Sequence, residues 1–360
     1  MNRVWLASAV LLLAVLQGCA GRREQAPSAD PAQVRAELLR LLPTTLKDRQ
    51  GWAEDIQVAF AAQRLEPSRS NLCAVLAVTE QESTFSADPQ VPNLGRIARE
   101  EIDRRAARLH IPGLLVDGAL NTRSANGQTY QQRLQAVRSE GQLSALFDDF
   151  LAGLPLGESL LGGFNPVRTG GPMQVSVDFA QRHAQDYPYA HEGSLRQEVF
   201  TRRGGLYFGI AHLLGYPTHY ERPLYRFADY NAGWYASRNA AFQAALSRVT
   251  GTALALDGDL IAPGALLPGT TERAARRLGT KLGLRNPQIR SQLALENSLA
   301  LEDSALYRGV FALADAQAGK PLPRAVLPGI VLQSPKITRT LTTAWFAERV
   351  DGRYQRCLQR

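Results

Sequence analysis

The sequence predicts a mainly α-helical fold. Apolar residues recur at the spacing of an amphipathic helix from Pro31 onward, where Val34, Leu38 and Leu42 share one face. The same spacing continues over residues 45–65. From there to about residue 250, helical patterns interrupted by Gly and Pro are common, whereas the alternating apolar and polar residues typical of strands are scarce.

Residues 1–18 predict a lipoprotein signal peptide. Arg3 gives a short basic start, and residues 4–16 are almost wholly apolar, a run too short to span a bilayer comfortably but suited to a signal-peptide core. The run ends in Gly18 and Cys19 and resembles the lipobox of bacterial lipoproteins. This resemblance implies cleavage before Cys19 and acylation of its thiol and new amino group. The alternative is an ordinary signal peptide with an incidental cysteine.

The residues after this cysteine predict where the anchored chain would lie. Ala20 stands where an aspartate would resemble an inner-membrane retention signal, so the outer membrane is favoured, with the protein facing the periplasm. Residues 19–32 are small and polar, contain proline and lack an apolar period through most of their length, as expected of a flexible tether. The expected membrane contact is therefore the N-terminal lipid anchor.

A helix further along carries a candidate general acid. It opens after residues 67–71, several of which can cap a helix, and its apolar run over residues 72–78 leads to Glu82. Burial at the end of such a helix raises the pKa of a carboxyl group and keeps a proton available near neutral pH. Glu80 competes for this role. Side chains two residues apart on a helix point to nearly opposite sides, so only one of the two carboxylates can face a given cleft.

Two later segments complete a pattern with this helix. Residues 82–85 read Glu-Ser-Thr-Phe, residues 171–174 read Gly-Pro-Met-Gln, and residues 230–233 read Tyr-Asn-Ala-Gly. In this order the motifs resemble those of the lysozyme-like lytic transglycosylases, which cut bacterial cell-wall glycan. The chain also looks similar to a family of uncharacterised bacterial envelope lipoproteins. The resemblance to the transglycosylases implies a lysozyme-like domain over residues 33–250 that binds peptidoglycan glycan strands.

The resemblance implies a single catalytic carboxyl group, that of Glu82. Cleavage of the β-1,4 bond between N-acetylmuramic acid and N-acetylglucosamine needs a proton on the departing oxygen, while the sugar's own N-acetyl group replaces a second carboxylate. Glu82 would then act as a base toward the C6 hydroxyl and give a 1,6-anhydromuramic end, because a held internal hydroxyl outcompetes water. No cofactor is implied.

Five further residues match the family's substrate-binding positions. Ser83 would orient the acid or the N-acetyl group, and Met173 would form a flexible apolar wall. Gln174 would reach sugar hydroxyls or the acetamide. Tyr230 would hydrogen-bond near the acid, and Asn231 would hold the acetamide.

The sequence departs from the family in three places. Pro172 replaces the usual Leu and removes a backbone donor, and residues 205–210 are the best counterpart of a helix whose preceding Asn is missing here. An insertion of about residues 86–169 separates the first two motifs, with helices expected over 94–109 and 130–152. The insertion would either border the substrate cleft or pack away from the site.

Residues 251–360 show no catalytic pattern. Helices are expected over 271–284, 301–318 and 334–358, and this part is interpreted as a helical extension packed on the catalytic unit. A separate glycan-binding module is the alternative, although no internal repeat supports one.

Two cysteines remain after the predicted lipidation site, Cys73 and Cys357. Export would place them in an oxidising compartment, where a disulfide between them would tie the tail to the helix of the candidate acid. Loop-entropy arguments give such a long closure about 4–5 kcal/mol of stability. The alternative is two unconnected cysteines, with Cys73 packed in the core.

Charge and histidine spacing argue against other functions. The net charge of +8 arises from 41 Lys and Arg against 33 Asp and Glu, spread along the chain without a long basic tract, so no nucleic-acid partner is expected. His191-Glu192 has no second His at helical spacing, and His212 and His219 also lack the spacing of zinc ligands, so no metal is expected. The sequence identifies no protein partner.

Two rival functions keep the same fold. In a muramidase-type hydrolase, water would replace the C6 hydroxyl and leave reducing ends. In a non-catalytic peptidoglycan-binding envelope lipoprotein, the same cleft would hold glycan or a partner without turnover. The insertion and the missing Asn favour this second rival.

Overall fold

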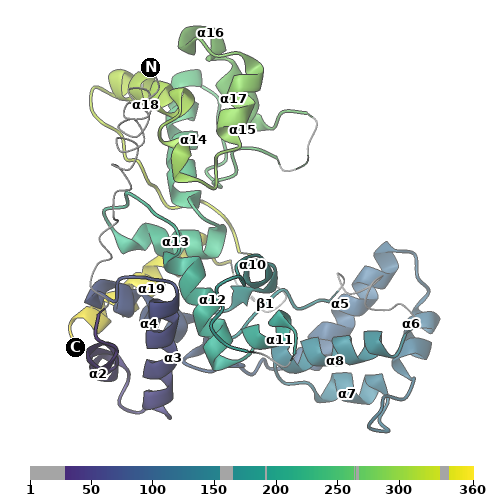
Figure 1. The fold of residues 1–360 in the computed structure, drawn as a ribbon. Helices are drawn as coiled ribbons and strands as arrows, with labels where there is room; N and C mark the ends of the chain where they lie inside the picture. Colours follow the sequence, from purple (N-terminus) through teal and green to yellow (C-terminus); the bar gives the residue numbers. More distant parts are fainter. Residues whose placement is uncertain (1–28, 155–164, 191–192, 263, 265–266, 333–339) are drawn as a thin grey trace, which may run out of the picture.

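The computed structural model describes residues 29–154, 165–190, 193–262, 264, 267–332 and 340–360, and it confirms a mainly α fold (Figure 1). Within these ranges, strands are limited to an antiparallel pair, β1 (Thr169–Gly170) and β2 (Val175–Ser176). The predicted signal peptide, Cys19 and most of the predicted tether lie outside the described residues.

The largest hydrophobic core, named here the first core, contains residues from all three sequence motifs: Phe85, Met173 and Tyr230. It is built from N-terminal helices, from helices of the middle of the chain and from the last helix. These are α2 (Pro31–Leu41), α3 (Arg49–Ala62), α4 (Arg69–Ser83), α10 (Val177–Arg182), α11 (Leu195–Val199), α12 (Arg202–Leu214), α13 (Pro223–Ala232) and α19 (Thr343–Leu358). The motifs are therefore joined by packing between segments far apart in the sequence.

Local capping sets where the first helices begin. α2 starts at Pro31 as predicted, because Asp30 accepts a hydrogen bond from the first turn and proline suits that position. α3 starts at Arg49, later than predicted. Asp48 adopts the left-handed conformation there and accepts the backbone N–H of Gly51 at 3.1 Å, so it ends the preceding turn and caps the helix.

The helices of the insertion lie together at the lower right of Figure 1 and share a core of their own. Its helices are α5 (Leu94–Arg108), α6 (Gly113–Leu120), α7 (Tyr130–Ala136) and α8 (Glu140–Ala152). The prediction of one helix over 130–152 is wrong. The backbone is extended at Val137 and Ser139, and the Ser139 hydroxyl caps α8 by accepting the N–H of Gln142 at 3.3 Å.

A second core, named here the second core, lies beyond the last motif. It contains α14 (Ala236–Thr250), α15 (Thr270–Arg276), α16 (Gly279–Leu282), α17 (Asn286–Leu293), the 3-10 turn η2 (Leu299–Leu301) and α18 (Ala305–Ala318). The prediction of one helix over 271–284 is wrong, because Arg277 and Leu278 form tight turns that separate α15 from α16. α14, which ends at residue 250, contributes residues to the second core.

The last helix, α19, returns to the first core and packs against α4 and α13. It begins at Thr343, while residues 334–339 of the predicted helix lie outside the described residues. A disulfide joins Cys73 of α4 to Cys357 of α19, with their Cα atoms 5.5 Å apart. Across the described ranges, no helix is both long and apolar enough to cross a membrane.

Candidate functional site

Glu82 lies in the last turn of α4, just before two residues in the left-handed conformation. Residues 72–79 are buried, whereas Glu82 is partly exposed. Thr84 and Phe85 both have positive φ angles, 51° and 60°, a conformation that costs energy for such side chains and is found where surrounding structure imposes it. The turn therefore places Glu82 at the junction of buried helix and solvent.

Phe85 fixes this turn to the first core. Its ring is only 8% exposed and meets the ring of Trp52 edge to face, with centroids 5.5 Å apart. The guanidinium of Arg202 lies 5.7 Å from the centre of the Trp52 ring. The aromatic residue of the first motif thus acts as an anchor for the turn that carries the acid.

The second motif forms a tight loop against α12. Gly209 permits this contact, because a Cβ atom there would lie 2.6 Å from Met173 Sδ. A Cβ atom at Gly205 would likewise come too close to Pro172. Gln174 has a positive φ of 52°, and its side-chain amide donates to the carbonyl of Gly171 at 3.3 Å. The glycines predicted as the counterpart of a family helix therefore serve close packing of loop on helix.

Tyr230 joins the three motifs. Its hydroxyl donates to the backbone carbonyl of Met173 at 2.6 Å, and its side chain is only 8% exposed. Burial raises the pKa of Tyr230 well above its ordinary value, and the negative charge of Glu82 raises it further. Glu82 therefore lies close enough to the Tyr230–Met173 contact to act on it electrostatically.

The three other predicted binding residues are also engaged within the protein. Met173, expected to form a flexible apolar wall, is completely buried in the first core. The Ser83 hydroxyl donates to the carbonyl of Thr79 at 3.1 Å and so closes the last turn of α4. Asn231 is exposed, and its side-chain carbonyl accepts from the Thr343 hydroxyl of α19 at 3.1 Å.

The two candidate acids have different surroundings. Glu80 forms an ion pair with Arg353 of α19, at 3.5 Å from carboxylate oxygen to Nε. Glu82 interacts with Tyr230 of α13. The two carboxylates thus interact with different helices, Glu80 with α19 and Glu82 with α13.

Asp229 is a structural residue of the site that sequence reasoning missed. It is completely buried, and its carboxylate accepts from the hydroxyls of Tyr216 and Tyr220 at 3.0 and 2.7 Å and from the backbone N–H of Ser237 at 2.7 Å. Burial raises the pKa of Asp229, and the hydrogen bonds oppose that rise. Its one sequence signal is an acidic residue directly before Tyr230, at the turn into α14.

His212 is a second missed residue. One ring nitrogen, Nε2, lies 3.1 Å from the carbonyl oxygen of Tyr230, while the described residues offer Nδ1 no hydrogen-bond partner. Burial lowers the pKa of His212 to about 4, so the ring is neutral at pH 7 and its Nε2 hydrogen faces the carbonyl. His212 therefore supports the backbone of the third motif.

A polar groove of about 1200 Å³ lies on another face of α12. Its lining includes Tyr207 and Leu214, which at about 100° per residue stand opposite Gly205 and Gly209 on this helix. Glu82, Met173 and Tyr230 are not among the residues that line this groove. Throughout the described part of the chain, no group of three or more His, Cys, Asp or Glu side chains could hold a metal ion.

The chemistry available at this site is that of one carboxyl group on a rigid support. Glu82 stands in the last turn of α4, one residue before Ser83 ends the helix. The nearby backbone is held by Tyr230, Phe85 and their partners. Such an arrangement can deliver a proton to a bound group and take one back.

The chain belongs to the family described as "Protein of unknown function (DUF1615)", whose model matches residues 45–360. It is similar to the "Uncharacterized protein YaiW" of Escherichia coli (strain K12), with 53% identity over 364 residues that cover all of both chains. No solved structure gives a significant match.

Proposed function

We propose that this protein is a peptidoglycan lytic transglycosylase in which Glu82 is the single general acid and base. The observation that carries the proposal is the meeting of the three motifs. Tyr230 bonds to the backbone of Met173, and both lie beside the charge of Glu82. Glu80 forms an ion pair with Arg353 of α19, whereas the charge of Glu82 acts on Tyr230.

The proposed reaction has two steps. Glu82 gives its proton to the glycosidic oxygen while the N-acetyl carbonyl of the N-acetylmuramic acid attacks the anomeric carbon, and the bond to the departing sugar breaks. Glu82 then takes the proton of the C6 hydroxyl, whose oxygen attacks the same carbon and displaces the acetamide. The product is a 1,6-anhydromuramic end, and Glu82 is protonated again.

The proposed location is the periplasmic face of the outer membrane, through a lipid on Cys19. The mildly basic chain, with a net charge of +8, suits the anionic stem peptides of the proposed substrate.

The test uses full-length protein in detergent with purified sacculi. Mass spectrometry counts the anhydro-muropeptides released by wild type, by Glu82→Gln and by the matched control Glu80→Gln. We expect Glu82→Gln to lose about a hundredfold or more in rate, the contribution typical of a general acid, while Glu80→Gln stays active. Full activity of Glu82→Gln rejects the assignment. Reducing ends in place of anhydro ends indicate a muramidase.

A second candidate, a non-catalytic peptidoglycan-binding lipoprotein, is favoured by the internal hydrogen bonds of Ser83 and Asn231. Both side chains use these bonds within the protein, although the transglycosylase assignment needs them for substrate. Wild-type protein that binds sacculi and releases no muropeptide of either kind supports this candidate.

A further inference from the structure

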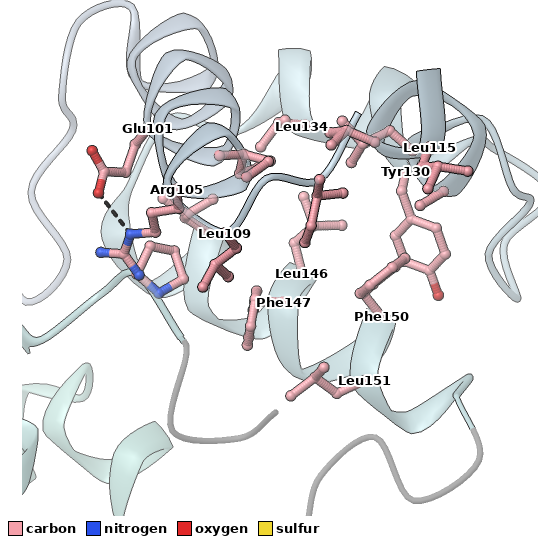
Figure 2. Close-up of a pocket in the computed structure, with 18 residues that line it drawn as sticks. Glu101, Arg105, Leu109, Leu115, Tyr130, Leu134, Leu146, Phe147, Phe150 and Leu151 are labelled. Atoms are coloured by element: carbon pink, nitrogen blue, oxygen red, sulfur yellow. Dashed lines mark hydrogen bonds and ion pairs between the residues drawn. The ribbon is translucent and has the colours of Figure 1, made fainter. Parts of the chain in front are cut away.

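The insertion encloses an apolar cavity of about 330 Å³ between α5, α6, α7 and α8 (Figure 2). This volume lies in the range of sites that bind small molecules. The wall is made almost entirely of aliphatic and aromatic side chains, among them Leu134, Leu146, Phe147 and Phe150. Apolar walls cannot replace the hydrogen bonds of enclosed water, so the cavity favours an apolar occupant.

The two ends of the cavity differ in chemistry. Figure 2 shows Arg105 and its partner Glu101 at one end, and Leu115, Tyr130 and Phe150 at the other. The Tyr130 hydroxyl is used by the backbone carbonyl of Asp149, to which it donates at 3.2 Å. The charged side chains among the lining residues are Arg105 and Glu101, so a polar group on an occupant is expected at the end that holds them.

The charge at that end is positive. The last turns of α5 carry Arg104, Arg105 and Arg108, and both Arg104 and Arg105 pair with the one carboxylate of Glu101. Arg108 is exposed one residue before Leu109. At about 100° per residue these three arginines share one face of α5 with Glu101, whereas Asp103 points away from it, so this face favours a negatively charged group.

The rim of the cavity exposes apolar side chains to solvent. Leu109 and Leu115, which both line the cavity, are 59% and 63% exposed, and Ile111 between α5 and α6 is 42% exposed. Large apolar side chains are exposed together in this way where a ligand or membrane is contacted. The apolar surface is thus continuous from the outside of the insertion into its interior.

We infer that this cavity binds the acyl chain of a single-chain anionic lipid, with the head group at the Arg105 end and the chain running toward Tyr130 and Phe150. The apolar walls fit the hydrocarbon, and the cluster of arginines fits a carboxylate or phosphate head. This site does not depend on the proposed transglycosylase activity, since it lies in a core separate from the one that holds Glu82.

Photolabelling of the full chain tests the inference. The protein is reconstituted in nanodiscs and irradiated with a dodecanoate analogue that carries a diazirine at the end of its chain, and peptide mass spectrometry locates the adducts. We expect adducts on cavity residues of α7 and α8. Ala119→Trp should reduce them at least tenfold, because Ala119 lines the cavity and a large side chain there fills it from α6. The matched control is Ala107→Trp, at an exposed position of α5 outside the lining, which should leave labelling unchanged.

The head-group half of the inference has its own arm. Arg105→Gln should weaken labelling by the dodecanoate analogue severalfold and leave labelling by the matching neutral dodecanol analogue unchanged, whereas Arg96→Gln, away from the cavity, should change neither. Absence of cavity adducts in wild type overturns the inference, as does equal labelling of wild type and Ala119→Trp. Circular dichroism verifies that each variant is folded.

Discussion

Removal of the disulfide between Cys73 and Cys357 should destabilise the protein strongly. The two half-cystines are 0% and 3% exposed, and they join the helix that ends at Glu82 to the last helix of the chain. The bridge spans 284 residues of sequence. In the unfolded chain such a bridge holds distant segments together, which lowers the entropy of the unfolded state.

The size of the effect follows from the length of this loop. Chain-entropy arguments give about 5 kcal/mol for a closure of this length, and removal of natural disulfides typically costs about 2–5 kcal/mol. With a urea dependence of about 3 kcal/mol per molar, a loss of about 3 kcal/mol moves the unfolding midpoint down by about 1 M.

Urea unfolding, followed by circular dichroism and by tryptophan fluorescence, measures this shift. The variant is Cys73→Ala/Cys357→Ala, in which the small buried side chains leave no unpaired thiol. The control is Cys19→Ala, which removes the third cysteine and should keep the wild-type midpoint. Coincident midpoints for wild type and the double variant would refute the reasoning.

Three further perturbations test the surroundings of Glu82. Tyr230→Phe should cost about 1–3 kcal/mol in urea unfolding, since it leaves the buried Met173 carbonyl without its donor; an unchanged midpoint would show that this bond contributes nothing. Gly209→Ala should cost about 1–3 kcal/mol, because the added Cβ would lie 2.6 Å from Met173 Sδ. The control Gly118→Ala, whose added Cβ would have nothing within 4 Å, should be neutral or slightly stabilising. Equal midpoints for the two variants would contradict the packing argument. His212 has a pKa of about 4 in the folded protein against an ordinary value of 6.5, so the unfolded state takes up the proton first as the pH falls. The free energy of unfolding therefore decreases between about pH 6.5 and pH 4, by about 3 kcal/mol in total. Comparison of wild type with His212→Gln at each pH isolates this loss, and parallel pH profiles would count against it.

The sequence predicted well those features that are determined locally. The mainly α class follows from apolar periodicity, and the start of α2 at Pro31 follows from the preceding Asp30 and the proline itself. The predicted helices over 130–152 and 271–284 were too long, because apolar periodicity continues across a short break. The extended backbone at Ser139 shows where such a break occurs.

The site was predicted in part. The sequence order of the motifs led to the expectation that Glu82, Met173 and Tyr230 lie together, and the Tyr230–Met173 bond joins two of them beside the third. The burial of Met173 could not be predicted, since it depends on Gly209, which follows the motif by more than thirty residues. The partner of Asn231 is equally distant in sequence, because Thr343 belongs to the last helix.

The position of α19 explains why the end of the chain matters to a site formed by its middle. α4 and α13 carry the first and third motifs, and neither has a covalent or local reason to keep its orientation toward the other. α19 packs against both. It contacts α4 through the Arg353–Glu80 ion pair and the disulfide, and it contacts α13 through the Thr343–Asn231 hydrogen bond. Because these contacts reach both motif helices from one rigid helix, the distance from Glu82 to Tyr230 depends on α19 although α19 contributes no residue to the motifs.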